Sequence, residues 1–202
     1  MDITAISAAL PALQARALAT LEGRKTCPVG AYLTLRTEAQ ALDLTTLEAA
    51  RFRQRFNGYY GVRRNSAWRS CFYDLFERTK GLACGRAEAF DFVLDGLQAG
   101  QGRVEASFAS KAICTLWPEG PVIDSVLRGF LKGFGPVPPI AGLDQAKGFY
   151  RSLEGWMGQL VDSEEARSWA QIFDDRFSDL EGAAGIHPMK KLDFLIWGGA
   201  AR

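Results

Sequence analysis

The chain has 202 residues, of which 48% are hydrophobic and 23% are charged, and its formal net charge is +1. This composition excludes an intrinsically disordered chain, because it provides enough apolar side chains for one sizeable core. Since the charges nearly cancel, the net charge identifies no partner, and any nucleic-acid contact must come from local clusters of basic residues.

Apolar residues recur at helical spacing in nearly every segment, and alternating stretches long enough to form strands are absent. We therefore expect an all-α protein, a compact multi-helix globule that forms a single domain over residues 1–202. The first helix is expected between Ile3 and Leu18, with an interruption at Pro11, because proline removes a backbone donor. A loop should follow, with the turn-forming residues Gly23, Pro28 and Gly30.

The next helices are delimited by capping and glycine signals. Thr45 and Glu48 stand in the T-x-x-E relation of a capping box, which predicts a second helix that ends at Gly58. A third helix should end at Gly81 and a fourth at Gly100. The short connection 101–103 then predicts a helical hairpin with a fifth helix.

Asp124 is positioned to cap a sixth helix through its side-chain oxygen. The proline-rich segment 133–139 is the one predicted linker. Beyond it, we expect a C-terminal helical lobe over residues 140–202, packed with the N-terminal helix. Its second helix should be opened by the pair Asp162 and Glu165, and its last helix should run from Pro188 to Trp197.

The cysteines and the single histidine do not have the spacing of a metal site. Cys27, Cys71, Cys84 and Cys114 form no C-x-x-C motif, so we expect no metal cluster and no cofactor. No segment has about 18 consecutive apolar residues, and no basic N-terminal region precedes an apolar core. The sequence therefore predicts a cytoplasmic monomer that does not span a membrane.

Residues 51–73 contain six arginines and no acidic residue, with aromatic residues between them. Arginine binds phosphate with a planar fork of donors, and aromatic rings stack on exposed bases, so this stretch favours contact with a nucleic acid. The alternative is a solvated helix face whose arginine stems cover the core. Arg63, Arg64, Arg69, Tyr59 and Tyr60 are the candidate contacts.

Lys111 and Asp124 are the candidate chemical groups. Lys111 lies within an apolar helical run, where desolvation would lower its pKa and favour the neutral, nucleophilic amine. Most lysines of amphipathic helices only reach solvent, and capping alone would account for Asp124.

These segments together resemble the helix-hairpin-helix DNA glycosylase superfamily, over about residues 45–132. Ser107-Phe108-Ala109-Ser110-Lys111 is similar to the hairpin of that family, Gly-hydrophobic-Gly-x-Lys, with Ser107 and Ala109 in place of its glycines. The segment 121–128 is similar to the family's Val-Asp-Thr-His-Val-x-Arg, without the histidine. The segment 58–65 is similar to its Gly-Phe/Tyr-x-x-Lys-Ala stretch.

The resemblance implies a DNA-binding enzyme that excises a base from an extruded nucleotide. Asp124 would stabilise the developing positive charge on the sugar, and Lys111 would attack the sugar carbon and form a Schiff base. Ser107 and Ser110 would then join the nucleic-acid contacts. Two other interpretations stay open: a nucleic-acid-binding module without catalysis, and a helical domain whose arginines face an acidic protein.

Overall fold

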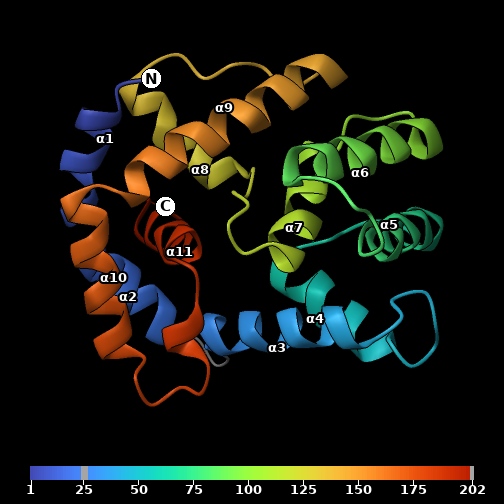
Figure 1. The fold of residues 1–202 in the computed structure, drawn as a ribbon, viewed down its shortest axis with the longest axis horizontal. Coiled ribbons are helices and arrows are strands. Elements are labelled where there is room, and N and C mark those ends of the chain that lie inside the picture. The colour runs from blue at the N-terminus through green and yellow to red at the C-terminus, as the bar shows by residue number, and fades with distance from the viewer. Residues whose placement is uncertain (24–26, 201–202) are drawn as a thin grey trace.

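The structure is a computed structural model that describes residues 1–23 and 27–200, and every regular element in these two ranges is a helix (Figure 1). The all-α prediction is thereby confirmed. The α-helices are α1 (Ile3–Ala9), α2 (Gln14–Glu22), α3 (Pro28–Ala41), α4 (Ala50–Tyr60), α5 (Ser66–Thr79), α6 (Arg86–Gln101), α7 (Ala106–Leu116), α8 (Ser125–Leu131), α9 (Leu143–Val161), α10 (Glu164–Arg176) and α11 (Pro188–Ala200). Short 3₁₀ helices are η1 (Leu10–Leu13), η2 (Lys132–Phe134) and η3 (Ala183–Gly185).

The helices form two packed groups, and the chain passes from one to the other and back (Figure 1). In the first group, α11 packs on α2 and α10, and α1 packs on α9, so the N-terminal and C-terminal helices lie together. In the second group, α5 packs on α6 and α6 on α7. Helix α3 contacts α2 of the first group as well as α4 and α7 of the second, and α6 packs on α9, so these contacts connect the groups. Helix α8 packs on α11.

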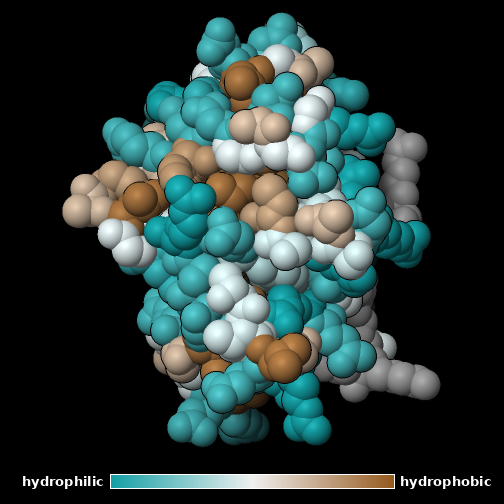
Figure 2. Space-filling view, turned by 90° about the vertical axis from the view of Figure 1, so that its right-hand side faces the viewer, coloured by the Kyte–Doolittle hydropathy of each residue, from teal (hydrophilic) through white to brown (hydrophobic). Residues whose placement is uncertain are grey.

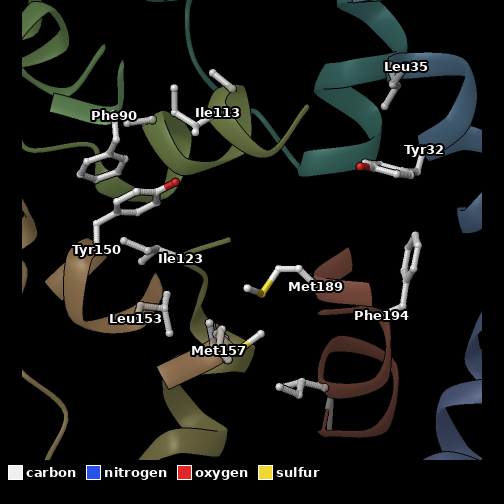
Figure 3. Packing of buried hydrophobic residues seen from close by; sticks show 14 of the residues in the cluster. Tyr32, Leu35, Phe90, Ile113, Ile123, Tyr150, Leu153, Met157, Met189 and Phe194 are labelled. Carbon is white, nitrogen blue, oxygen red and sulfur yellow. The ribbon is translucent and has the colours of Figure 1, made fainter. Parts of the chain in front are cut away.

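Aromatic side chains provide much of the packing within and between the groups. Figure 3 shows Phe90 of α6 and Tyr150 of α9 face to face, with ring centroids 4.0 Å apart and planes within 3°. Within the second group, a cluster of buried rings holds α4 against α5; it consists of Phe52, Phe56, Phe72, Tyr73 and Phe76. Burial of this apolar area is the main source of stability for the fold.

Several helix ends follow the local rules that the sequence indicates. Pro11 lies in η1, which interrupts the first helical segment as predicted. Asn65 caps α5 by accepting a hydrogen bond from the Trp68 amide at 2.8 Å. The hairpin of α6 and α7 and the cap at Asp124 are also present.

The structure differs most from the sequence-based prediction at α3. Pro28 and Gly30 were expected in a loop, but both lie in this helix, with Pro28 at its first position. Proline is well suited to that position because its missing amide would have no partner there. Gly23 does end α2, and residues 24–26 of the predicted loop lie outside the described residues.

The predicted capping pair Thr45 and Glu48 is also wrong, since α4 begins at Ala50. The Thr45 amide and hydroxyl instead donate to the Asp43 carboxylate at 2.9 and 2.7 Å, which closes a local turn. In α10, Ser163 rather than Asp162 is the cap and accepts a bond from the Ala166 amide.

Two glycines predicted as helix ends, Gly58 and Gly100, lie inside α4 and α6. The helices end three and two residues later, at Gly61 and Gly102, whose φ angles of 66° and 68° are left-handed. Glycine adopts this conformation without the steric cost that other residues have.

Because Gly58 is helical and Gly61 is left-handed, alanine should have opposite effects at the two positions, and neither Cβ would meet a heavy atom within 4 Å. We expect Gly58→Ala to raise the free energy of unfolding by about 0.5–1 kcal/mol and Gly61→Ala to lower it by about 1 kcal/mol. Urea unfolding measures both. Equal signs for the two variants would contradict the assigned end of α4.

Candidate functional site

The principal cavity lies where the two groups of helices meet, and its volume is about 840 Å³. Helices α3, α4, α7 and α11 and the segment before α8 all contribute to its wall. Exposed residues, among them Thr34, Arg55 and Gly58, form its mouth, while buried residues such as Val122 and Lys190 lie deeper. A cavity of this size is within the usual range for small-molecule sites.

Lys111 and Asp124, the two candidate chemical groups, both line this cavity. A hydrogen bond between the two residues that precede them explains how they come together. The hydroxyl of Ser110 accepts a bond from the Ile123 amide at 2.8 Å, so the residue before Lys111 is joined to the residue before Asp124. Lys111 and Asp124 are 13 residues apart in the sequence, and the turn through 118–122 therefore folds the chain back onto α7.

Lys111 is half-buried, and its amine donates a hydrogen bond to the Tyr60 carbonyl at the end of α4, at 3.2 Å. The amine also lies 5.0 Å from the centre of the Phe108 ring. Burial lowers the pKa of Lys111, and the nearby carboxylate of Asp124 opposes this effect. The fraction of neutral amine at a given pH is thus higher than in a solvated lysine.

Asp124 is the N-cap of α8, and its Oδ1 accepts a hydrogen bond from the Leu127 amide at 2.7 Å. Burial raises the pKa of Asp124 and Asp193 raises it further, whereas the cap bond and Lys111 lower it. Asp124 and Lys111 form no direct ion pair in the described part of the chain.

A second pair, Lys190 and Asp193 of α11, also lines the cavity and was missed by the sequence analysis. Their charged atoms are 2.5 Å apart, and the side chain of Lys190 is only 4% exposed. Burial disfavours the charged form of Lys190, but Asp193 and the other groups around it together outweigh this effect and hold the pKa of Lys190 well above its usual value. Lys190 is therefore protonated at neutral pH.

Of the predicted aromatic contacts, Tyr59 and Tyr60 both line the cavity, together with Phe194 and Trp197 of α11. The rings of Tyr59 and Tyr60 meet edge to face with centroids 4.7 Å apart. Burial raises the pKa of both phenols, so they stay protonated at neutral pH. The cavity thus offers flat aromatic surfaces beside the amine of Lys111.

The predicted contacts Arg63, Arg64 and Arg69 do not line this cavity. Arg55 does line it, and it forms an ion pair with Glu38. Arg64 is bound to Glu105 at 2.7 and 3.0 Å and lies near the hairpin of α6 and α7. Arg69 lines a separate cavity of about 570 Å³ between α4 and α5. Arg63 is exposed, and among the described residues neither Arg63 nor Arg69 forms an ion pair.

The segment that resembles a hairpin, Ser107 to Lys111, lies inside α7, while the connection between α6 and α7 is 102–105. Ser107 is half-buried in the first turn of α7. Ser110 is fully buried, and its hydroxyl donates to the Ser107 carbonyl at 3.0 Å in addition to holding Ile123. Ser110 therefore positions Lys111 and offers no surface to a phosphate.

The described residues contain no group of three or more His, Cys, Asp and Glu side chains that could hold a metal ion. Likewise, none of the described helices combines the length and the apolar character needed to cross a bilayer.

The face over α5 and α6 is mostly hydrophilic, with hydrophobic side chains in smaller groups (Figure 2).

Comparisons with protein-family models, with curated proteins and with solved structures find no match for this chain. The functional argument therefore depends on the cavity itself. It contains an amine of lowered pKa, a carboxylate from a different element, a buried ion pair and aromatic walls. This arrangement is suited to nucleophilic chemistry on a polar, partly planar ligand.

Proposed function

We propose that the protein binds DNA and acts as an N-glycosylase-like enzyme, with Lys111 as nucleophile and Asp124 as the group that stabilises positive charge. The supporting observation is that both side chains line one cavity although they come from separate elements. The aromatic walls support the same proposal, because a base extruded from the duplex is stabilised by about 1–3 kcal/mol on stacking.

In the proposed reaction, the neutral amine of Lys111 attacks C1′ of the deoxyribose. The C1′–Nζ bond forms as the bond from C1′ to the base breaks, and the base leaves with the bonding electrons and takes up a proton. The new ammonium loses a proton, and opening of the sugar ring gives a protonated imine, which water hydrolyses to release the amine. The Asp124 carboxylate would stabilise the positive charge that develops on the sugar.

Asparagine at position 124 tests this role, because it caps a helix about as well as aspartate does but has no charge. We expect Asp124→Asn to keep the thermal stability and the DNA affinity and to lower excision by roughly 10²-fold or more. Excision is measured on duplexes that each contain one altered base, such as uracil, hypoxanthine or 8-oxoguanine. Unchanged excision would reduce Asp124 to a helix cap.

A second candidate function is DNA binding without catalysis, and the exposed Arg63 supports it, because among the described residues it forms no ion pair and its guanidinium is available to a phosphate. In that case every duplex binds and none is cleaved. Affinity that falls steeply with salt would support binding through phosphates. A protein that binds no DNA even at low salt would contradict both functions and favour an acidic protein partner.

A further inference from the structure

The buried ion pair of Lys190 and Asp193 is unusual because it lies in a helix that is apolar on most sides. The neighbours Met189, Leu192 and Leu195 are all buried. The amine of Lys190 lies 4.8 Å from the ring centres of both Tyr32 and Phe194, so it is enclosed by aromatic groups as well as by Asp193. A buried ion pair adds little to stability compared with apolar side chains of similar volume.

The position of the pair indicates what else it does. Asp193 is not fully buried, with 14% of its side chain exposed, and it lines the same cavity as Lys111 of α7. Two carboxylates, Asp124 and Asp193, therefore face the cavity into which Lys111 projects its amine. Without a counter-charge, both would favour the protonated form of Lys111, which is not a nucleophile.

We propose that Lys190 and Asp193 are a positioning pair for Lys111: Lys190 neutralises Asp193, so that Asp124 is the one uncompensated carboxylate next to the amine. The inference rests on the proposed function, since it concerns the same amine, but it makes a claim about electrostatics that is measurable without DNA. Asp193 lines the same cavity as Lys111 and Asp124; its charge raises the pKa of both, and Lys190 opposes this effect at Asp124.

The charged and titratable groups around the cavity all affect the charge state of Lys111. On α4, Arg55 is occupied by Glu38, and the Tyr59 and Tyr60 phenols are neutral. On α7, burial raises the pKa of the Cys114 thiol, which is therefore also neutral. Cys27, ahead of α3, completes the set. Among the described residues that line the cavity, Lys111 and Asp124 are thus the amine and the carboxylate that no ion pair occupies.

The two members of the pair should affect Lys111 in opposite directions. Lys190→Gln removes a positive charge and leaves Asp193 uncompensated, so the pKa of Lys111 should rise and less neutral amine should be present. Asp193→Asn leaves Lys190 uncompensated, so the pKa of Lys111 should fall and more neutral amine should be present. In the double variant the two changes should nearly cancel.

The experiment measures the rate at which a small arylating reagent, fluorodinitrobenzene, labels Lys111 as a function of pH, with the labelled site identified by mass spectrometry. At neutral pH, we expect labelling to be about fivefold slower in Lys190→Gln and about fivefold faster in Asp193→Asn, since one pKa unit corresponds to a factor of ten. Lys190→Gln/Asp193→Asn should lie within about twofold of the original protein.

Charge-retaining variants separate electrostatics from packing. Lys190→Arg and Asp193→Glu disturb the packing but keep the charges, so both should label at close to the original rate. A single variant that loses its fold, as judged by circular dichroism, is measured in sucrose, which favours the compact state. The proposal would be overturned if Lys190→Gln and Asp193→Asn changed the labelling rate in the same direction. It would also be overturned if Lys190→Arg and Asp193→Glu changed the rate as much as the charge-removing variants do.

Because the reagent reads Lys111 directly, the two hypotheses can fail separately. Opposite shifts in labelling without excision of any base would support the positioning pair and contradict the proposed glycosylase. Excision of a base, together with unchanged labelling rates in all variants, would support the glycosylase and contradict the positioning pair.

Discussion

Lys111→Ala is expected to abolish covalent capture of DNA by the protein. A duplex with an abasic site presents an aldehyde, which condenses with a neutral amine to an imine, and borohydride reduces the imine to a stable secondary amine. We expect the captured fraction to fall by roughly 10²-fold or more, the scale at which removal of a positioned catalytic group acts. Denaturing electrophoresis of the radiolabelled duplex measures the adduct.

The matched control is Lys132→Ala, which removes an exposed lysine of η2 that lies outside the cavity. Capture by this variant should equal that of the original protein. Because burial lowers the pKa of Lys111, its capture rate should rise with pH and level off at a lower pH than that of a solvated lysine. Equal capture by Lys111→Ala would remove this lysine from the mechanism.

Much of the helical architecture follows from local sequence signals. The segment with Trp68, Phe72, Leu75 and Phe76 has strong helical periodicity, and its helix begins at a residue that caps it, Asn65. The last helix begins at Pro188 as predicted, since proline is favoured in the first turn. Such signals depend on nearby residues only, so a single sequence contains them in full.

The loop predicted around Pro28 and Gly30 is wrong because both residues are typical of turns but also occur in the first turn of a helix. Its buried positions Val29, Tyr32 and Leu35 do follow the helical period, and Pro28 marks its first turn. The periodicity should therefore have outweighed the glycine. Packing of α3 on α4 and α7 stabilises the helix, and these contacts between distant segments are not visible in a local pattern.

The site was predicted in part for a similar reason. Lys111 and Asp124 belong to one continuous stretch, so a motif could indicate both. Lys190 and Asp193 lie in the last helix and reach the same cavity only through tertiary packing. The signal that could have found them is two consecutive lysines, Lys190 and Lys191, inside an otherwise apolar helix, because lysine is almost never buried without a partner.

Phe56 connects the stability of the fold to the cavity. It is fully buried in α4, and its ring centroid lies 5.5 Å from that of Phe76 and 4.7 Å from that of Tyr60. Loss of the ring would leave a void between α4 and α5. It would also loosen the contact with Tyr60, the residue whose carbonyl holds the amine of Lys111.

Phe56→Ala is therefore expected to lower the free energy of unfolding by about 3–5 kcal/mol, through lost apolar burial and the remaining cavity. Urea unfolding measures this loss. Leu47→Ala is the control, because Leu47 is 90% exposed and its truncation should change stability by less than about 0.5 kcal/mol. A loss below about 1 kcal/mol for Phe56→Ala would mean that α4 is not held by the aromatic cluster. The carbonyl that positions Lys111 would then need another support.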